Sequence, residues 1–209
     1  MKKIILTLAF AVAAVAAMAQ TTDTKSDKKD DFDRLNVGIH AGVTAAQISF
    51  PDVALTTGGK AGWYGGAELQ YNVEKWLGIR LGCDYSLNRA YVPNPADVFG
   101  SRLNYQQSSV TMPLTLQIGY FDKEESVSFG LGGFVSYNFN KTGALMSSAD
   151  NKGFGGGLQC SVDFGYGHLF YQLLMRYDLS EIGFRTPGVS GPYPSANLFS
   201  VMLGIGYRF

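Results

Sequence analysis

Two histidines and a scatter of serines are the side chains from which this chain could build a catalytic or metal site. Nucleophilic hydrolysis needs a serine or cysteine beside a base, and a zinc site needs several histidine, cysteine or carboxylate ligands. His40 and His168 are the only histidines, they lie far apart in the sequence, and neither has a cysteine close by. The sequence therefore predicts no catalytic residue, no cofactor and no metal ion.

Charged residues are placed in a way that points to another kind of chemistry, the burial of paired ions. Within segments that alternate between apolar and small polar residues, the charges fall on the side opposite the bulky apolar residues. Because an unpaired buried charge is very costly, we expect these groups to pair with one another. The charged positions on this side are Glu68, Arg80, Asp84, Asp163, Arg176, Asp178 and Arg208. His40, Gln117 and Gln159 lie on the same side, and we expect them to join a structural polar network there.

One contact of this network follows from the sequence directly. Glu68 and Arg80 flank a short connection between two segments. If Tyr71 faces Leu77 across that connection, Glu68 faces Arg80, which predicts a direct cross-strand ion pair. We expect His40 to lie at a similar depth. In one interpretation the ion pair is structural and fills the interior, and in the other it forms part of a proton or ion path.

The elements that position these residues are β-strands, because from residue 35 onward the apolar residues recur with a period of two. Each segment has about the 9–11 residues that a tilted strand needs to cross a bilayer. The predicted strands are 35–48, 61–71, 77–88, 105–120, 127–139, 153–164, 169–179 and 197–209. This even number of strands predicts an all-β fold, an eight-stranded antiparallel up-and-down transmembrane β-barrel.

The connections between the segments alternate in length. Short connections are predicted at 72–76, 121–126 and 165–168, and long ones at 49–60, 89–104, 140–152 and 180–196. Short periplasmic turns and long extracellular loops are typical of outer-membrane barrels. Six of the seven prolines lie in the long connections, and for the exception, Pro113, we expect a bulge or a lost hydrogen bond within the strand.

A soluble lipocalin-type cup is the main alternative, and the two faces of the strands argue against it. One face is bulky and uncharged, whereas the other is rich in glycine, carries the seven charges and contains no lysine. Lysine and glutamate should be plentiful on a face exposed to water, whereas a narrow membrane barrel needs small or paired polar groups inside. We therefore expect the bulky face to contact lipid, with Cys83 and Cys160 on it as free thiols.

Aromatic residues near the strand ends predict two interfacial girdles. The first comprises Tyr71, Trp76, Tyr120, Phe121, Tyr166, Tyr207 and Phe209, and the second comprises Tyr85, Tyr105, Tyr137, Phe139, Phe154, Tyr177 and Phe199.

Composition excludes several classes of protein. Lys+Arg and Asp+Glu are both 17, so no basic excess exists to hold a nucleic-acid backbone. Two cysteines are too few for a disulfide scaffold, and 16 % charged residues is low against about 25 % in soluble domains.

The N-terminal residues have the pattern of an export signal. Two lysines precede an apolar stretch that is too short to span a membrane comfortably, and Ala17-Met18-Ala19 fits a signal-peptidase site. We expect residues 1–19 to be a cleaved signal peptide, 20–34 a disordered periplasmic tail and 35–209 the barrel, located in the cell outer membrane.

Three stretches resemble a known family. In the run 198–209, apolar residues alternate with small or polar ones up to the terminal phenylalanine. This run is similar to the barrel-assembly signal of outer-membrane proteins, and Tyr207 and Phe209 are its characteristic residues. The runs 109–121 and 173–184 resemble strands of the PorT-like outer-membrane β-barrel domain. That resemblance spans roughly 35–209 and implies an integral outer-membrane barrel with no shared catalytic residues, some of whose members take part in protein secretion.

The expected function is a structural or surface-interaction role carried by long extracellular loops around a filled lumen. Candidate contact residues in these loops are Tyr91, Phe99, Phe184 and Tyr193. The alternatives are a subunit of an envelope or secretion complex and, more distantly, a lipid-modifying enzyme. The latter is disfavoured because Ser108 and Ser109 have no histidine at their level. Expected partners are outer-membrane lipid and the barrel-assembly machinery, with an envelope protein as a further partner in the alternative of an envelope complex, but no nucleic acid.

Overall fold

A computed structural model describes residues 34–49, 58–93, 102–122, 124–142, 153–180 and 196–209. The predicted signal peptide and all but the last residue of the predicted tail lie outside this part, as do Phe99, Phe184 and Tyr193. No described residue belongs to a helix that is long and apolar enough to cross a membrane.

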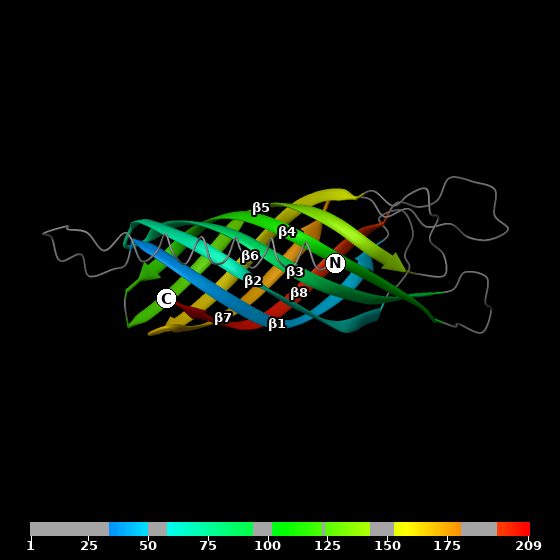
Figure 1. The fold of residues 1–209 in the computed structure, drawn as a ribbon, viewed down its shortest axis with the longest axis horizontal. Helices are drawn as coiled ribbons and strands as arrows, with labels where there is room; N and C mark the ends of the chain where they lie inside the picture. Colours follow the sequence, from blue (N-terminus) through cyan, green and yellow to red (C-terminus); the bar gives the residue numbers. More distant parts are fainter. Residues whose placement is uncertain (1–33, 50–57, 94–101, 123, 143–152, 181–195) are drawn as a thin grey trace, which may run out of the picture.

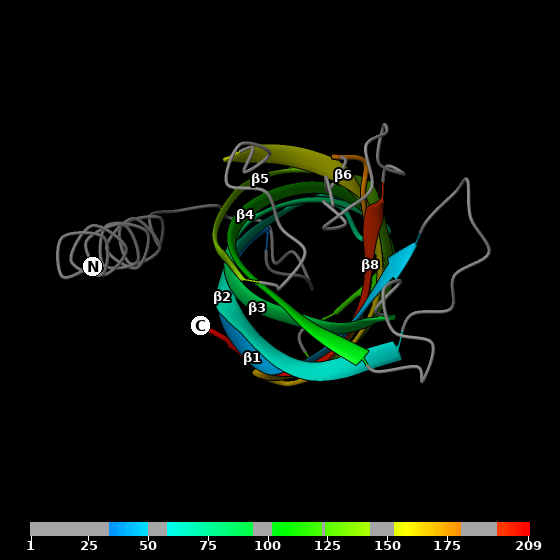
Figure 2. The ribbon, with the colours of Figure 1, turned by 90° about the vertical axis from the view of Figure 1, so that its right-hand side faces the viewer.

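The described residues form eight β-strands, as the alternation predicts. Their bounds are β1 Leu35–Ser49, β2 Gly58–Glu74, β3 Leu77–Pro93, β4 Arg102–Phe121, β5 Glu125–Thr142, β6 Phe154–Tyr166, β7 Leu169–Asp178 and β8 Asn197–Arg208. Each strand pairs antiparallel with the next, and β1 pairs with β8, so the sheet closes into a barrel. Figure 1 shows the tilted strands from the side, and Figure 2 shows the closed ring along its axis.

The two ends of the barrel differ in the length of their connections. At one end, here called the turn end, the strands are joined by residues 75–76, 122–124 and 167–168. Gly167 has a φ of 56°, which only glycine adopts at little cost, and this allows the two-residue turn between β6 and β7. The opposite end, called the loop end, has the longer connections. Most strands run further than predicted, and Tyr91, expected in a loop, lies in β3.

Side chains alternate between the two faces of the wall. Bulky apolar residues point outward and are exposed, among them Ile39, Val43, Leu81, Leu114, Leu131, Val135, Leu158 and Leu203. Cys83 and Cys160 are free and partly exposed on this face, as predicted. The girdle prediction is wrong for Tyr105 and Phe121, which are only 2 % and 4 % exposed. Both lie on the luminal phase of β4, where their rings fill the two ends of the interior.

Pro113 interrupts one of the two ladders of β4. Toward β3, pairing stops at Leu114 opposite Leu81 and resumes at Thr111 opposite Asp84 without a change of register. Toward β5 the ladder is continuous. Because proline has no N–H to donate, the structure confirms a loss of pairing here and shows no bulge.

Candidate functional site

The polar residues of the lumen are the candidate site, and they form two linked ion clusters. They come from luminal positions of β1, β2, β3, β6, β7 and β8, the strand positions that alternate with the lipid-facing ones. Most of these side chains are buried although they are polar or charged. Since burying an unpaired charge costs several kcal/mol, their mutual contacts decide what the lumen can do.

Arg80 is the centre of the first cluster. Its Nη1 donates to Asp163 Oδ2 at 3.0 Å, and its Nη2 donates to Gln70 Oε1 at 3.1 Å. Asp163 also accepts hydrogen bonds from Ser161 Oγ at 3.0 Å and from Gln172 Nε2 at 2.9 Å. Arg80 on β3 is therefore joined across the lumen to Asp163 on β6.

Glu68 contacts Arg80, but not as predicted. Tyr71 faces Ile79 rather than Leu77, so Glu68 lies opposite Gly82 and Arg80 lies opposite Gln70. The predicted direct pairing across the strands is wrong. The turn between β2 and β3 is shorter than expected, and this moves the register by two residues. An ion pair still forms diagonally, with Arg80 Nε 3.5 Å from Glu68 Oε2.

Asp84 is the centre of the second cluster. His40 Nε2 lies 2.9 Å from Asp84 Oδ1, and the guanidinium of Arg176 donates to Asp84 Oδ2. Arg176 Nε also donates to Gln159 Oε1 at 3.0 Å. His40 Nδ1 is 3.9 Å from Glu68 Oε2, so His40 links the second cluster to the first.

Arg208 extends the clusters toward the turn end. Its Nε is 3.7 Å from Glu68 Oε1, its Nη1 donates to Ser126 Oγ at 3.2 Å, and its guanidinium lies 4.5 Å from the centre of the Phe170 ring. With Arg80 and Arg176, it balances the three carboxylates of Glu68, Asp84 and Asp163, so the clusters are neutral when His40 is neutral. Such an arrangement compensates its charges internally and leaves none in excess.

The remaining predicted members of the network lie apart from the ions. Gln117 donates to Thr115 Oγ1 at 2.9 Å and accepts from Ser128 Oγ at 3.2 Å, without a contact to a charged group. Asp178 is buried further toward the loop end and accepts a hydrogen bond from the Ser180 N–H. The sequence prediction did not include Gln70 and Gln172, although both share the phase of the charged residues that they contact.

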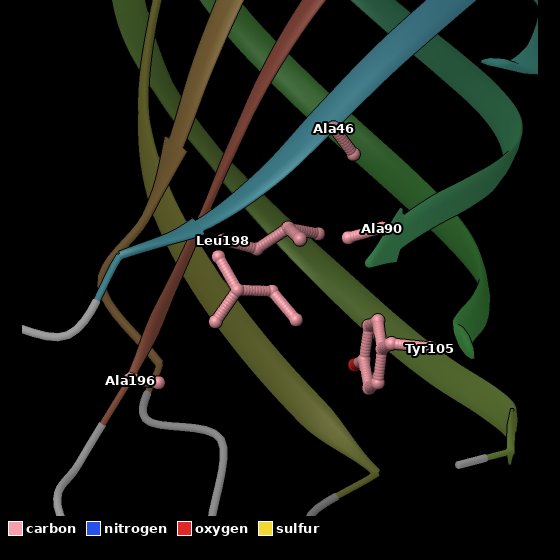
Figure 3. Packing of buried hydrophobic residues seen from close by; sticks show 6 residues of the cluster. Ala46, Ala90, Tyr105, Ala196 and Leu198 are labelled. Carbon is pink, nitrogen blue, oxygen red and sulfur yellow. The ribbon is translucent and has the colours of Figure 1, made fainter. Parts of the chain in front are cut away.

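A cluster of buried apolar side chains lies in the lumen at the loop end. It consists of Ala46, Ile48, Ala90, Tyr105, Ala196 and Leu198, each at most 4 % exposed. Figure 3 shows these side chains gathered between the strands. The Tyr105 hydroxyl donates to Gln107 Oε1, which satisfies the only polar group of the cluster. We call this set the apolar seal.

The described residues line two spaces at different heights in the barrel. Near the apolar seal, a space of about 20 Å³ among hydroxyl and amide groups has room for about one water molecule. At the turn end, a space of about 280 Å³ is lined by Gln70, Asn72, Phe121, Arg208 and Phe209, among others. The lumen is thus roomier at the turn end than at the apolar seal.

The two histidines differ in their surroundings. The rings nearest to His40 are those of Tyr64 and Phe170, at 5.7 and 6.4 Å between centres. In the part of the chain that the structure describes, no group of three or more potential ligands is arranged to hold a metal ion. His168 lies in the turn after β6, where Nδ1 is 2.9 Å from the Arg208 carbonyl oxygen.

The two residues of the predicted assembly signal lie together on the outer surface. Tyr207 and Phe209 are 41 % and 65 % exposed, and their rings meet edge to face at 5.2 Å. The His168 ring stacks on the other side of Tyr207 at 5.3 Å. The Phe209 N–H donates to the Val37 carbonyl at 2.9 Å, so the C-terminus is fixed to β1.

Comparison with known proteins agrees with this geometry. The outer membrane protein OprG from Pseudomonas aeruginosa shares 14 % identity, with 88 % of this chain and 99 % of that chain covered and a TM-score of 0.52. Ail from Yersinia pestis shares 11 % identity, with 85 % and 100 % covered and a TM-score of 0.47. At these identities the similarity concerns the fold alone. No curated protein matches this chain.

A family model described as "Outer membrane protein beta-barrel domain" matches residues 18–182, which is more than half of the chain. The turn end is then periplasmic and the loop end extracellular. The exposed apolar face, the closed sheet and the family match lead to one conclusion: the chain belongs to the outer membrane protein beta-barrel domain family and is an integral outer-membrane β-barrel protein.

Proposed function

We propose that this protein is a closed, lipid-anchored barrel that acts at the cell surface through its extracellular connections and not by transport through its lumen. The observation that carries this proposal is the apolar seal. Its six side chains are nearly inaccessible, and no more than about one water molecule fits into the space beside it. An ion would have to give up most of its hydration to pass the seal, which is very costly.

The ion clusters support the same function. In an open pore, charged groups face water and remain free to interact with the permeating ion. Here each arginine of the lumen is engaged with a carboxylate, and Arg80 and Asp163 are joined at 3.0 Å. An eight-stranded barrel has an interior just wide enough for side chains to fill, so this packing is expected for a structural core.

Conductance measurements test the closed lumen. The full chain is refolded, its insertion into a planar lipid bilayer is verified, and the current is recorded at both polarities. We expect no steady conductance from the wild type. The double variant Tyr105→Ala and Leu198→Ala removes the aromatic ring of the seal and one of its two branched aliphatic side chains. This variant should conduct measurably more than the wild type. Stepwise, persistent channels of the wild type would contradict the proposal.

We further propose that the chain belongs more narrowly to the PorT-like barrels and that a second function, as a subunit of an envelope or secretion complex, follows from that assignment. Its support is the pattern of 109–121, which lies within β4 and includes a strand-interrupting Pro113. The experiment is extraction of the native outer membrane in mild detergent by a tag in the N-terminal tail. A stoichiometric partner favours the second function, whereas a barrel that purifies alone favours the first.

The proposal also includes the fate of the N-terminus and the absence of enzymatic activity. We propose that residues 1–19 are removed on export, which mass spectrometry of the purified protein tests directly.

Among the described residues, no serine, threonine or tyrosine hydroxyl forms a hydrogen bond with His40, and this favours a protein without lipid-modifying activity. Lipid and the barrel-assembly machinery remain the proposed partners during biogenesis.

A further inference from the structure

Two cations are paired across the strands at the extracellular end of the barrel, where the hydrogen bond of Lys60 to Asn104 is exposed. Lys60 on β2 is paired across the strands with Arg89 on β3. Like charges placed directly opposite each other repel, so this pair destabilises the sheet unless an anion compensates it. Compensation therefore requires an anion beside Lys60 and Arg89.

A β-bulge produces this pairing. Trp63 lies opposite Leu87, whereas Lys60 lies opposite Arg89, so β2 contains one extra residue between these two pairs. Bulges redirect side chains, and this one brings Lys60 to the side of β3 on which Arg89 stands. The contacts of Lys60 agree, since its Nζ lies 5.1 Å from the centre of the Tyr91 ring.

Among the described residues, the groups that orient the pair carry no negative charge. Lys60 Nζ donates to Asn104 Oδ1 at 3.1 Å, a neutral acceptor. Arg89 Nε is buried without a hydrogen-bond partner. In the ranges that the structure describes, no carboxylate lies within 4.0 Å of either cation. The described residues thus hold two positive charges in place, and those of them that contact the pair are neutral.

The position of the pair relative to the membrane identifies the class of anion. Trp63 and Tyr85 are in contact at 5.1 Å, and Tyr85 contacts Phe139 at 6.0 Å, which forms a line of outward-facing aromatic rings across β2, β3 and β5. Such rings sit at the level of lipid headgroups. Lys60 and Arg89 come next toward the extracellular end, beyond this line of rings.

We infer that Lys60 and Arg89, with Asn104 beside them, form a binding site for the phosphate of an anionic lipid headgroup in the outer leaflet. The planar guanidinium can donate two parallel hydrogen bonds to two oxygens of a phosphate group, and the ammonium adds a second charge. The site is distinct from the lumen and does not depend on the proposed surface function. Its occupant is a membrane lipid and not a free anion, because the two cations lie beside the aromatic line.

Binding of lipid A that carries both phosphates tests this site, measured by native mass spectrometry of the full barrel in neutral detergent. A basic residue near an anionic membrane surface contributes about 1 kcal/mol, or about fivefold in affinity. The double variant Lys60→Gln and Arg89→Gln should therefore bind on the order of thirtyfold more weakly. The matched control is Lys75→Gln, in an exposed turn at the periplasmic end, which should bind like the wild type.

Two further measurements identify the source of the phosphate. Dephosphorylated lipid A should bind the wild type as weakly as intact lipid A binds the double variant, and millimolar inorganic phosphate should not compete. Unchanged heat-dependent mobility on gels shows that the variants are folded. The inference is overturned if the folded double variant binds lipid A within twofold of the wild type, if Lys75→Gln weakens binding equally, or if inorganic phosphate displaces the lipid.

Discussion

The contact between Arg80 and Asp163 offers the sharpest test of the luminal network as a structural element. The two side chains are 6 % and 2 % exposed and 3.0 Å apart. At an effective dielectric constant of about 20, their Coulomb attraction is about 5 kcal/mol before desolvation is subtracted. Removal of one partner leaves a buried, uncompensated charge, which costs about 3–5 kcal/mol. Because Arg80 and Glu68 remain 3.5 Å apart, we expect the lower end of this range for loss of Asp163.

A double-mutant cycle separates this cost from the loss of packing. Arg80→Met and Asp163→Asn should each lower the free energy of unfolding by about 3 kcal/mol. The double variant keeps the network neutral, with two arginines and two carboxylates, and should lose about 3 kcal/mol and not the sum of about 6. The coupling energy expected is thus about 3 kcal/mol. Gln117→Leu is the control, since it removes a luminal hydrogen-bonding group without a charge, and should cost about 1 kcal/mol.

Urea unfolding in lipid vesicles measures these free energies, followed by tryptophan fluorescence. Trp63 and Trp76 report on opposite ends of the barrel and are 51 % and 57 % exposed toward the lipid. If both single variants lose less than about 1 kcal/mol, the charges are not buried as the structure shows. If the double variant loses the full sum, the two residues do not act as a pair.

Three further perturbations test the faces of the wall. Leu131→Lys places a charge on the lipid face and should lower the free energy of unfolding in vesicles by about 2–4 kcal/mol, so unchanged stability would contradict the orientation of β5. Gly132→Ala should cost about 1–3 kcal/mol in the same assay, because its Cβ would overlap the β4 backbone, whereas Gly133→Ala meets only an ordinary contact at 3.4 Å and should be nearly neutral. Cys83 and Cys160 should react with a membrane-permeable maleimide and resist a charged one, and labelling of the folded protein in vesicles by the charged reagent would show that they face water.

The period of two in the sequence is sufficient to predict the strands and their faces, because it records which side of the wall meets lipid. It does not predict where the strands end. Near the rim the pattern reverses while the ladder continues, with Arg89 on the phase of the lipid-facing residues and Ala90 on the luminal phase, so β3 extends to Pro93, well beyond the predicted end at 88. The sequence pattern places Tyr105 in a girdle because this residue is aromatic and lies near a strand end. Its odd position in β4, where the even positions face lipid, would have placed it in the lumen.

Partners across the lumen could not be predicted from the sequence in the same way. Register depends on the number of residues in a turn. The turn has two residues instead of the five predicted and a bulge between Asn72 and Glu74 takes up one, so the register moves by two and Arg80 lies opposite Gln70 instead of Glu68. The contact of Arg80 with Asp163 depends further on closure of the barrel, which brings β3 and β6 face to face although they are not neighbours in the sheet. The alternation of apolar and polar residues along the chain contains no information about which strands face each other across the lumen.

The choice of arginine for the luminal cations follows from the same geometry. A guanidinium has five N–H donors in a fixed plane and can reach several acceptors at once, whereas an ammonium acts as a single point charge. Arg80 on β3 reaches Gln70 on β2 and Asp163 on β6, and Arg176 on β7 reaches Gln159 on β6 and Asp84 on β3. Each of these arginines therefore joins its own strand to one neighbour and to one strand across the lumen. Hydrogen bonds of this kind keep the cross-section of a narrow barrel fixed. We therefore assign the network to the stability of the wall and look for the activity of the protein on its outer surface.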